Sequence, residues 1–146
     1  MAATKKFKFL EIVTAEAAFQ AFGKNLNNLF ENCALAVTET MTNIKKIKPK
    51  TKKAIALKDK DLKALLVAFL NEIVYLKDAE QLLFSKYKVR VTQGKNKIWN
   101  LSAKLAGQKI NPAVHQLRAD IKAVTWHMFA LEQKGKGWTA RIVLDV

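Results

Sequence analysis

Carboxylates gather at the end of this chain in a setting where they could hold a cation. Residues 141–146 read Arg-Ile-Val-Leu-Asp-Val, a strand-like run that stays largely apolar up to the final position. If a strand ends here, the side chain of Asp145 and the α-carboxylate of Val146 lie close together. Two fixed carboxylates repel each other unless a cation or a hydrogen-bond donor lies between them. The simpler interpretation, which the strand pattern alone favours, is that Asp145 is a solvated residue ending an edge strand.

A second group of polar residues lies between positions 120 and 127. Asp120 and Lys122 alternate with apolar neighbours, which predicts that both side chains share one face of a strand. Thr125 and His127 continue this segment, and Asp145 is expected on the strand paired with it. Together these residues form either a small polar pocket or a solvated sheet face. The sequence alone slightly favours the solvated face.

The common signatures of enzymes are missing from the sequence. It has no phosphate-binding Gly-rich loop and no GxGxxG, GxSxG or HExxH motif. The two histidines, His115 and His127, lack the spacing of paired metal ligands. The single cysteine, Cys33, excludes an intramolecular disulfide and a CxxC metal site, and its apolar neighbours predict a buried, inert thiol. We therefore expect a protein that is not an enzyme, and an independent metal-dependent hydrolase is the weakest hypothesis.

The charge of the chain predicts attraction to polyanions. In 146 residues there are 26 Lys and Arg against 12 Asp and Glu, which gives a formal net charge of +14. Such a balance is typical of proteins that contact RNA or an RNA-bound partner, although a lysine-rich composition also arises from genome composition or a hot habitat. No apolar run is long enough to span a bilayer, and the first residues do not resemble a signal peptide. We expect a cytoplasmic protein without membrane contact.

The order of predicted elements indicates an α+β fold. Helical spacing of apolar residues predicts one helix over residues 26–41, capped by Asn25, and a second helix that begins at Asp59 or Asp61 and continues to about Leu76. Strands are expected at residues 7–13, 17–22, 51–57, 83–91, 98–105, 121–131 and 138–146. The prediction is one domain over residues 1–146, with two main helices packed on an antiparallel or mixed β-sheet. The expected core contains Leu29, Phe30, Cys33, Leu66, Phe69, Leu70, Ile73 and Val74.

Several short motifs resemble the archease family. Members of that family open with an acidic residue, then His-Thr-Ala-Asp, then a strand that ends in an aromatic residue and glycine. Here the corresponding residues are Glu11, then Val13-Thr14-Ala15-Glu16, then Phe22-Gly23. Further similar segments follow in the family's order with compatible spacing. The matching segments are distributed along nearly the whole chain, at residues 9–11, 13–23, 26–36, 61–72, 83–85, 120–127 and 141–146.

The resemblance implies a function and a site. Archeases are small proteins that activate the RtcB-type RNA ligase in tRNA splicing and RNA repair, by promoting guanylylation of the ligase and multiple turnover. They bind a divalent cation through carboxylates from both ends of the chain. Carried over to this sequence, the cation ligands are Glu16, Asp145 and the Val146 carboxylate, with calcium favoured over magnesium or manganese. Asp120, Lys122 and His127 are the candidate working residues nearby.

This chain departs from the family pattern at two positions. Glu16 stands where the family has Asp, and the preceding His is absent, with Ile12 and Val13 in that stretch. Glutamate keeps the carboxylate chemistry and can bind a hard cation with both oxygens. The alternative function is a general RNA-binding or RNA-chaperone module in tRNA processing, driven by charge. In that case aromatic residues between lysines, as in Lys86-Tyr87-Lys88 and Lys97-Ile98-Trp99, would stack on bases, unless they are half-buried strand positions.

Overall fold

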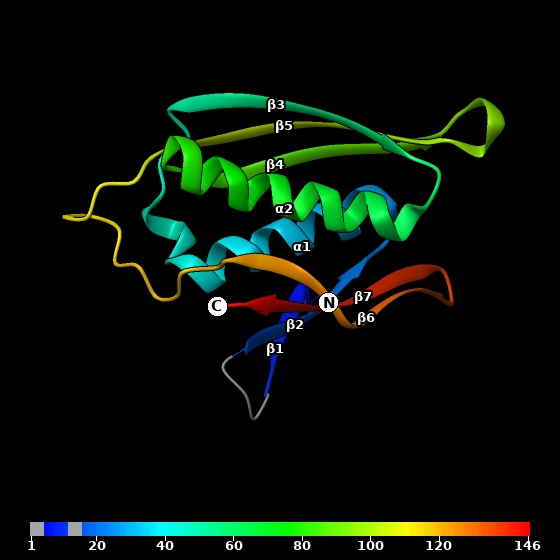
Figure 1. Ribbon diagram of the computed structural model, residues 1–146, viewed down its shortest axis with the longest axis horizontal. Helices are drawn as coiled ribbons and strands as arrows, with labels where there is room; N and C mark the ends of the chain where they lie inside the picture. Colours follow the sequence, from blue (N-terminus) through cyan, green and yellow to red (C-terminus); the bar gives the residue numbers. More distant parts are fainter. Residues whose placement is uncertain (1–4, 12–15) are drawn as a thin grey trace.

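The chain folds into three layers, with two helices between two antiparallel sheets (Figure 1). A computed structural model describes residues 5–11 and 16–146. The four-stranded sheet has the order β1 (Phe7–Leu10), β2 (Glu16–Gly23), β7 (Gly137–Asp145) and β6 (Ala123–Lys134). The three-stranded sheet has the order β3 (Thr51–Asp59), β5 (Trp99–Lys109) and β4 (Leu82–Gln93). Every strand pair in the described ranges is antiparallel, so the α+β prediction is confirmed in its antiparallel form.

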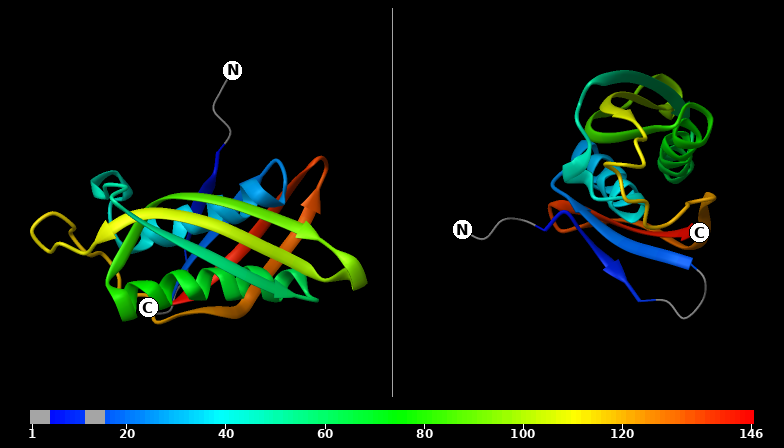
Figure 2. Two further views of the ribbon diagram at one scale, coloured as in Figure 1. Left: turned by 90° about the horizontal axis from the view of Figure 1, so that it is seen from above. Right: turned by 90° about the vertical axis from the view of Figure 1, so that its left-hand side faces the viewer.

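The two helices form the middle layer because both carry long apolar stripes. Helix α1 (Leu26–Met41) packs on β2 and β4, and helix α2 (Leu62–Glu80) contacts β6 and the three-stranded sheet. Figure 2 shows the same layering from two further directions. The rings of Phe30 and Phe69 stack between the helices, with 6.1 Å between their centroids. All eight residues predicted for the core are buried in one cluster, so this prediction is confirmed, and Cys33 is among them.

Both helices begin at the side chains that the sequence indicates. The Asn25 side chain accepts a hydrogen bond from the amide of Asn28, and the Asp61 side chain accepts one from the amide of Lys63. Asp59 lies two residues before this cap, and its side chain accepts a hydrogen bond from the Asp61 amide. Of the two candidates, Asp61 is therefore the cap of α2. Neither helix, nor any other helix among the described residues, has the length and hydropathy needed to cross a membrane.

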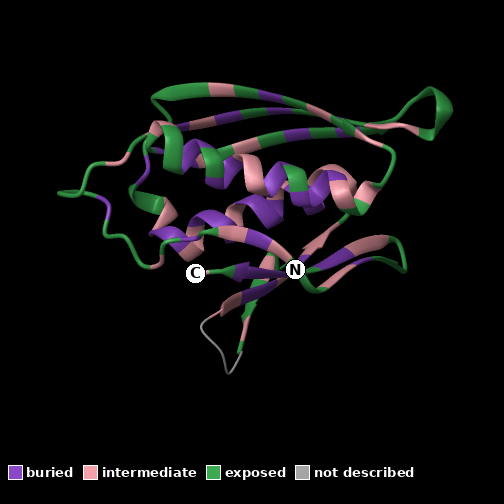
Figure 3. Cartoon of the chain, viewed as in Figure 1, coloured by how far each residue is buried: buried purple, intermediate pink, exposed green. Residues whose placement is uncertain are grey.

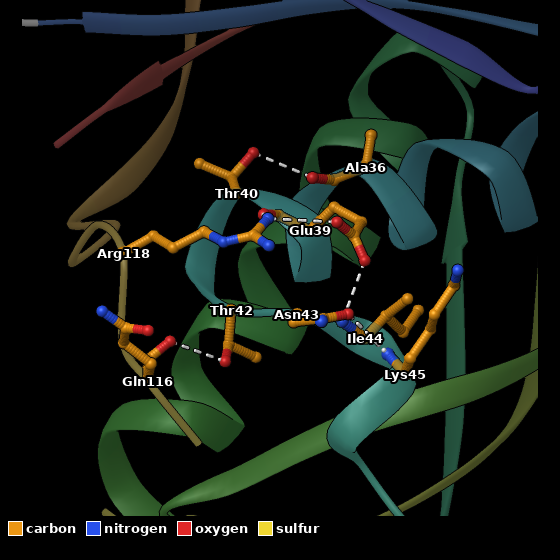
Figure 4. A network of polar contacts seen from close by, with 9 residues as sticks. All are labelled: Ala36, Glu39, Thr40, Thr42, Asn43, Ile44, Lys45, Gln116 and Arg118. Carbon is orange, nitrogen blue, oxygen red and sulfur yellow. Dashed lines mark hydrogen bonds and ion pairs between the residues drawn. The ribbon is translucent and has the colours of Figure 1, made fainter. Parts of the chain in front are cut away.

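The segment between β5 and β6 is a loop, and it is held at several points. Buried His115 accepts from the Asn111 amide through Nδ1, while its Nε2 lies 3.1 Å from the Lys46 carbonyl oxygen. Figure 4 shows the next attachment, where Arg118 donates to the backbone and side chain of Glu39 near the end of α1. In the same view Thr42 donates to the Gln116 carbonyl. These contacts fix the direction in which the chain enters β6.

Two strands differ from their predicted bounds in ways that affect the site. Strand β6 begins at Ala123, not at residue 121, because the preceding residues turn towards α2. Strand β2 begins at Glu16 itself. The predicted strand over residues 7–13 is observed from Phe7 to Leu10, and Ile12 and Val13 lie outside the described residues.

Candidate functional site

Glu16 and Asp145 meet although they stand at opposite ends of the sequence. The first residue of β2 and the last residue of β7 are direct partners in the antiparallel register. Directly opposite residues of an antiparallel pair lie on one face, with Cβ atoms about 4.5–5.5 Å apart. The expected convergence of these two carboxylates is therefore confirmed. We call the group formed by Glu16, Asp145 and Val146 the carboxylate corner.

The backbone at the carboxylate corner is held on both sides. Asp145 faces Glu16 across β2 and Ala123 across β6, and its carbonyl oxygen accepts from the Lys122 amide at 2.7 Å. Val146 follows with its side chain packed on the core. The strand alternation explains this arrangement, because Leu144 and Ile142 point inward and leave Asp145 exposed on the outer face. The end of the chain is thus part of the sheet, as its apolar pattern indicates.

Asp120 and Lys122 do not share a strand face, so this prediction is wrong. Both residues precede β6, and Asp120 bonds to Lys77 of α2, with 2.6 Å between Oδ1 and Nζ. Lys122 is exposed and is tied to the corner through its backbone amide. The alternation of polar and apolar residues does not mark a strand here, because Ile121 is buried in the loop before β6 and is not part of that strand.

The sequence reasoning missed Lys77, whose side chain is 8% exposed. Its Nζ also contacts Asp78 at 2.9 Å and donates to the Ile121 carbonyl at 3.1 Å. Burial alone would lower the Lys77 pKa, but the hydrogen bonds to Asp120 and Asp78 raise it above its ordinary value of 10.5. The hydrogen bond from Lys77 is also the main reason why the Asp120 pKa is below its ordinary value of 3.8. A lysine in the last turn of an apolar helix was the available signal.

His127 lies in a bulge of β6 that begins after Thr125, two residues along the strand from Ala123, the partner of Asp145. Thr125 pairs with Val143 and Ala130 with Arg141, so four residues of β6 stand opposite one residue of β7. The bulge exposes His127, whose amide donates to the Thr125 hydroxyl at 3.3 Å. The same hydroxyl donates to the Val143 carbonyl at 2.9 Å. The polar residues of this segment therefore bond mainly within the bulge.

The bulge also carries exposed apolar side chains. Trp126 and Met128 are about half exposed, and the Trp126 ring lies 5.0 Å from that of Phe129. Met128 has a left-handed backbone with a φ of 52°, and its carbonyl oxygen accepts from Arg141 Nε at 2.7 Å. This contact ties the bulge to β7 and keeps it on the outer side of the sheet.

The carboxylate corner suits a hard cation in the type of its ligands. Calcium, magnesium and manganese bind oxygen donors, and the corner offers the side-chain carboxylates of Glu16 and Asp145. In residues 5–11 and 16–146 no group of three or more His, Cys, Asp or Glu side chains is placed to hold a metal ion. Because calcium takes six to eight oxygens, most of its ligands at this corner would be water or come from a partner.

Comparison with known proteins gives a consistent result over nearly the whole chain. Residues 7–146 match the model described as the Archease protein family (MTH1598/TM1083). Proteins named "Protein archease" are similar to this chain, including one from Sulfurisphaera tokodaii that is 36% identical over 142 residues, covering 97% of this chain and 99% of the relative. One from Methanosarcina mazei is 33% identical over 142 residues, covering 97% of each.

Two solved structures resemble the fold. The solution structure of Methanobacterium thermoautotrophicum protein 1598 matches with a TM-score of 0.86 and 34% identity, over 98% of this chain and 100% of the other. A crystal structure from Thermotoga maritima, described as "an archease, possible chaperone", matches with a TM-score of 0.61 over 100% of both chains. At 16% identity the second likeness shows the fold alone.

Proposed function

The chain belongs to the archease family, and from this premise we propose that it activates an RtcB-type RNA ligase in tRNA splicing and RNA repair. In this role it promotes guanylylation of the ligase and allows repeated turnover, without being an enzyme itself. The description of the Thermotoga maritima relative as a possible chaperone agrees with action on a partner protein.

The observation that carries the proposal is the register that sets Glu16 opposite Asp145. Two carboxylates that face each other at a sheet end add little to the stability of the fold, so their presence points to a role in binding. The chain has Glu16 where the family has Asp, but the register still sets Glu16 opposite Asp145, with a side chain that is longer by one methylene. The pattern of the resemblance and the geometry support the same three residues.

A divalent cation at this corner would be held by Glu16, Asp145 and the Val146 carboxylate. Such an ion would supply positive charge next to the phosphates of a nucleotide on the ligase. The chain's own residues would orient it, since the β2–β7 ladder fixes both carboxylates before the partner arrives. The ligands that the corner lacks would come from water or from the ligase.

Lys122, whose amide bonds to Asp145, and His127, which lies farther along β6, are proposed as contacts to the ligase. Lys122 is exposed and follows Asp120, which Lys77 holds in place. His127 is presented by the bulge of β6. We propose that Lys122 takes part in docking, whereas Asp120 acts as a positioning residue through its contact with Lys77.

The test compares ligase stimulation by Asp145→Ala and by the matched variant Glu132→Ala. Glu132 is an exposed carboxylate of β6 that lies opposite Thr139, away from the corner. Purified RtcB-type ligase, GTP and an RNA with a cyclic-phosphate end are incubated with each variant, and ligase guanylylation and product per ligase are measured. Asp145→Ala should reduce both to the level without added protein, whereas Glu132→Ala should retain wild-type stimulation.

Unchanged stimulation by Asp145→Ala, with the variant folded by circular dichroism, would overturn the role of the corner. Lys122→Ala is measured in parallel, and the proposal expects lower stimulation with unchanged binding of free RNA. Equal losses of stimulation and RNA affinity would instead favour the alternative of a general RNA-binding or RNA-chaperone module.

A further inference from the structure

The outer face of the three-stranded sheet carries a concentrated positive charge. The strand register places alternate residues of β3, β5 and β4 on this face, and Figure 3 shows exposed stretches interrupted by less exposed ones along these strands. We call this surface the basic sheet face. Its cationic side chains are those of Lys52, Lys58, Lys86, Lys88, Arg90 and Lys104, all of them exposed.

The cations of the basic sheet face stand close together. Lys88 and Lys104 are direct cross-strand partners, an arrangement in which like charges destabilise a sheet. Lys86, Lys88 and Arg90 follow one another on the same side of β4, with a spacing of about 6.8 Å for alternate residues. Lys52, Lys86, Lys88 and Lys104 border one hollow of about 710 Å³. An anion that bridges these side chains would relieve their mutual repulsion.

No cation of this face forms an ion pair within the described ranges, and the carboxylate-bearing Glu31 of α1 borders a hollow at the edge of β4 with Lys88, Arg90 and Lys104. The positions between the cations are Ala54, Ala56, Asn100, Ser102, Ala106 and Thr92. Among the described residues, the ion pairs involve Lys53, Lys77 and Arg118, and none includes a cation of the basic sheet face. Lys53, on the inner side of β3, pairs with Glu80 at 2.7 Å. The six outward charges are therefore available to a partner.

From this geometry we infer that the basic sheet face binds the phosphate backbone of double-helical RNA. A row of regularly spaced lysines suits phosphates, whereas readout of bases in single strands uses exposed aromatic rings. The sequence suggests Tyr87 as such a ring, but Tyr87 points inward and its hydroxyl bonds to Thr38. Ser102 and Asn100 are exposed on the same side of β5 as Lys104, and their side chains would meet ribose hydroxyls of a bound helix.

Other polyanions fit this face less well. Binding to an anionic membrane is favoured by large apolar side chains that insert between lipids. The apolar side chains at the outer positions of these three strands are all alanines. The surface also lies on the sheet opposite the carboxylate corner, with the helix layer between them (Figure 1). RNA bound here would leave the corner free for a protein partner. The inference thus goes beyond the proposed function and does not depend on it.

The test measures binding of a labelled RNA hairpin with about 16 base pairs by fluorescence anisotropy, without any ligase. The variant Lys88→Gln/Arg90→Gln/Lys104→Gln neutralises the centre of the face. The control Lys45→Gln/Lys46→Gln/Lys48→Gln removes the same charge from exposed positions after α1. Wild type should bind with Kd of roughly 10⁻⁴–10⁻⁶ M at physiological salt.

The face variant should bind at least about ten-fold more weakly, and the slope of log K against log salt should fall by about 2–3. The control should stay within about two-fold of wild type. The double variant Lys88→Gln/Lys104→Gln removes two of these three charges and should therefore show about two thirds of that change in slope. Equal losses of RNA affinity in the face variant and the control would overturn the inference, because they would show that binding depends on the overall charge and not on the basic sheet face.

Two further probes separate the other anions. Single-stranded RNA of equal length should bind more weakly than the hairpin, and vesicles of phosphatidylserine and phosphatidylcholine should not compete with it. Tighter binding of the single strand, or displacement of the hairpin by vesicles, would overturn the assignment to double-helical RNA. Circular dichroism melting confirms that each variant remains folded.

Discussion

At the scale of single residues, Lys77 fixes the approach of the chain to the carboxylate corner. Its ammonium group bonds to Asp120 and to the Ile121 carbonyl, just before β6 begins. Because the side chain is almost fully buried, its charge is stabilised only while these partners remain in place. The lysine therefore controls the position of Lys122, whose amide bonds to Asp145.

We expect Lys77→Met to destabilise the fold by about 1–3 kcal/mol at pH 7, because a nearly buried hydrogen-bonding group is lost. The control is Lys53→Met, which removes a lysine from a half-exposed pair with Glu80 and should cost no more than about 1 kcal/mol. Urea unfolding followed by circular dichroism measures both. Equal losses would show that the burial of Lys77 has no special role.

The same variant should respond to pH in a defined direction. The Asp120 pKa is lowered in the folded chain, so the stability it contributes is present above 3.8 and is lost as the pH falls through the folded pKa. The Lys77 pKa is raised, so its contribution is present below 10.5 and is lost at higher pH. The difference between wild type and Lys77→Met should be constant between about pH 5 and 9 and smaller at pH 3. A difference that grows at pH 3 would contradict this assignment.

The carboxylate corner should bind calcium weakly by itself. Few protein oxygens are available there, so we expect Kd of about 10⁻⁴–10⁻³ M, in the range of weak calcium sites. Asp145→Asn should weaken binding at least about ten-fold, whereas Glu132→Gln should not change it. Isothermal titration calorimetry measures each constant. Identical calcium affinities for wild type and Asp145→Asn would exclude Asp145 as a ligand.

At the scale of elements, a bulge in β4 shapes the three-stranded sheet. The register of β4 on β5 shifts between Phe84 and Lys86, opposite Gly107. A Cβ atom at Gly107 would lie 1.8 Å from the Leu83 carbonyl oxygen, so the two backbones approach more closely than a side chain permits. The bulge turns β4 so that Phe84 enters the core while Lys86 and Lys88 remain on the basic sheet face.

Gly107→Ala should therefore destabilise the protein by about 3 kcal/mol or more, because backbone atoms must move. This corresponds to a Tm about 6–12 °C lower for a domain of this size. Gly94→Ala is the control, since its Cβ would meet the Asn100 side chain at 3.2 Å and that side chain can turn away. Thermal melting followed by circular dichroism should separate the two variants, and a Gly107→Ala melt like wild type would contradict the close approach.

At the scale of the whole molecule, charge is distributed unevenly over the two sheets. The basic sheet face is cationic throughout, whereas the outer face of the four-stranded sheet mixes Glu16, Asp145 and Glu132 with Arg141. The helices lie between these surfaces (Figure 1). One molecule can thus present a carboxylate corner and a polycation to different partners.

The net charge of +14 should make stability depend on salt. Self-repulsion weakens the compact state, and salt screens it over about 10 Å at 0.1 M. Tm should therefore rise when the KCl concentration is raised about ten-fold, from 0.05 to 0.5 M, because the Debye length shortens. The face variant Lys88→Gln/Arg90→Gln/Lys104→Gln should show a smaller rise in Tm than the variant at Lys45, Lys46 and Lys48. The reason is that the charges removed from the face stand closer together and repel each other more. A Tm that falls with salt would show that favourable ion pairs dominate instead.

The sequence by itself determined the elements and the core, because both depend on local periodicity. Apolar spacing located α1 and α2, and Asn25 marked the first cap correctly. The apolar run up to Val146 indicated that the chain end lies in a sheet. The motifs shared with the archeases also selected Glu16 and Asp145, which the register now sets opposite each other.

Only the tertiary structure decided which polar side chains meet. Alternation around Ile121 suggests a strand face, but the contact with Lys77 of α2 turns that segment into a loop. Tyr87 lies between lysines in the sequence, yet the pleat buries its ring and leaves Lys86 and Lys88 outside. Two partners of Lys77, Asp120 and Ile121, lie 43 and 44 residues away, and the cross-strand partner of Lys88 lies on β5. Periodicity reports the face of an element, and only packing determines what that face meets.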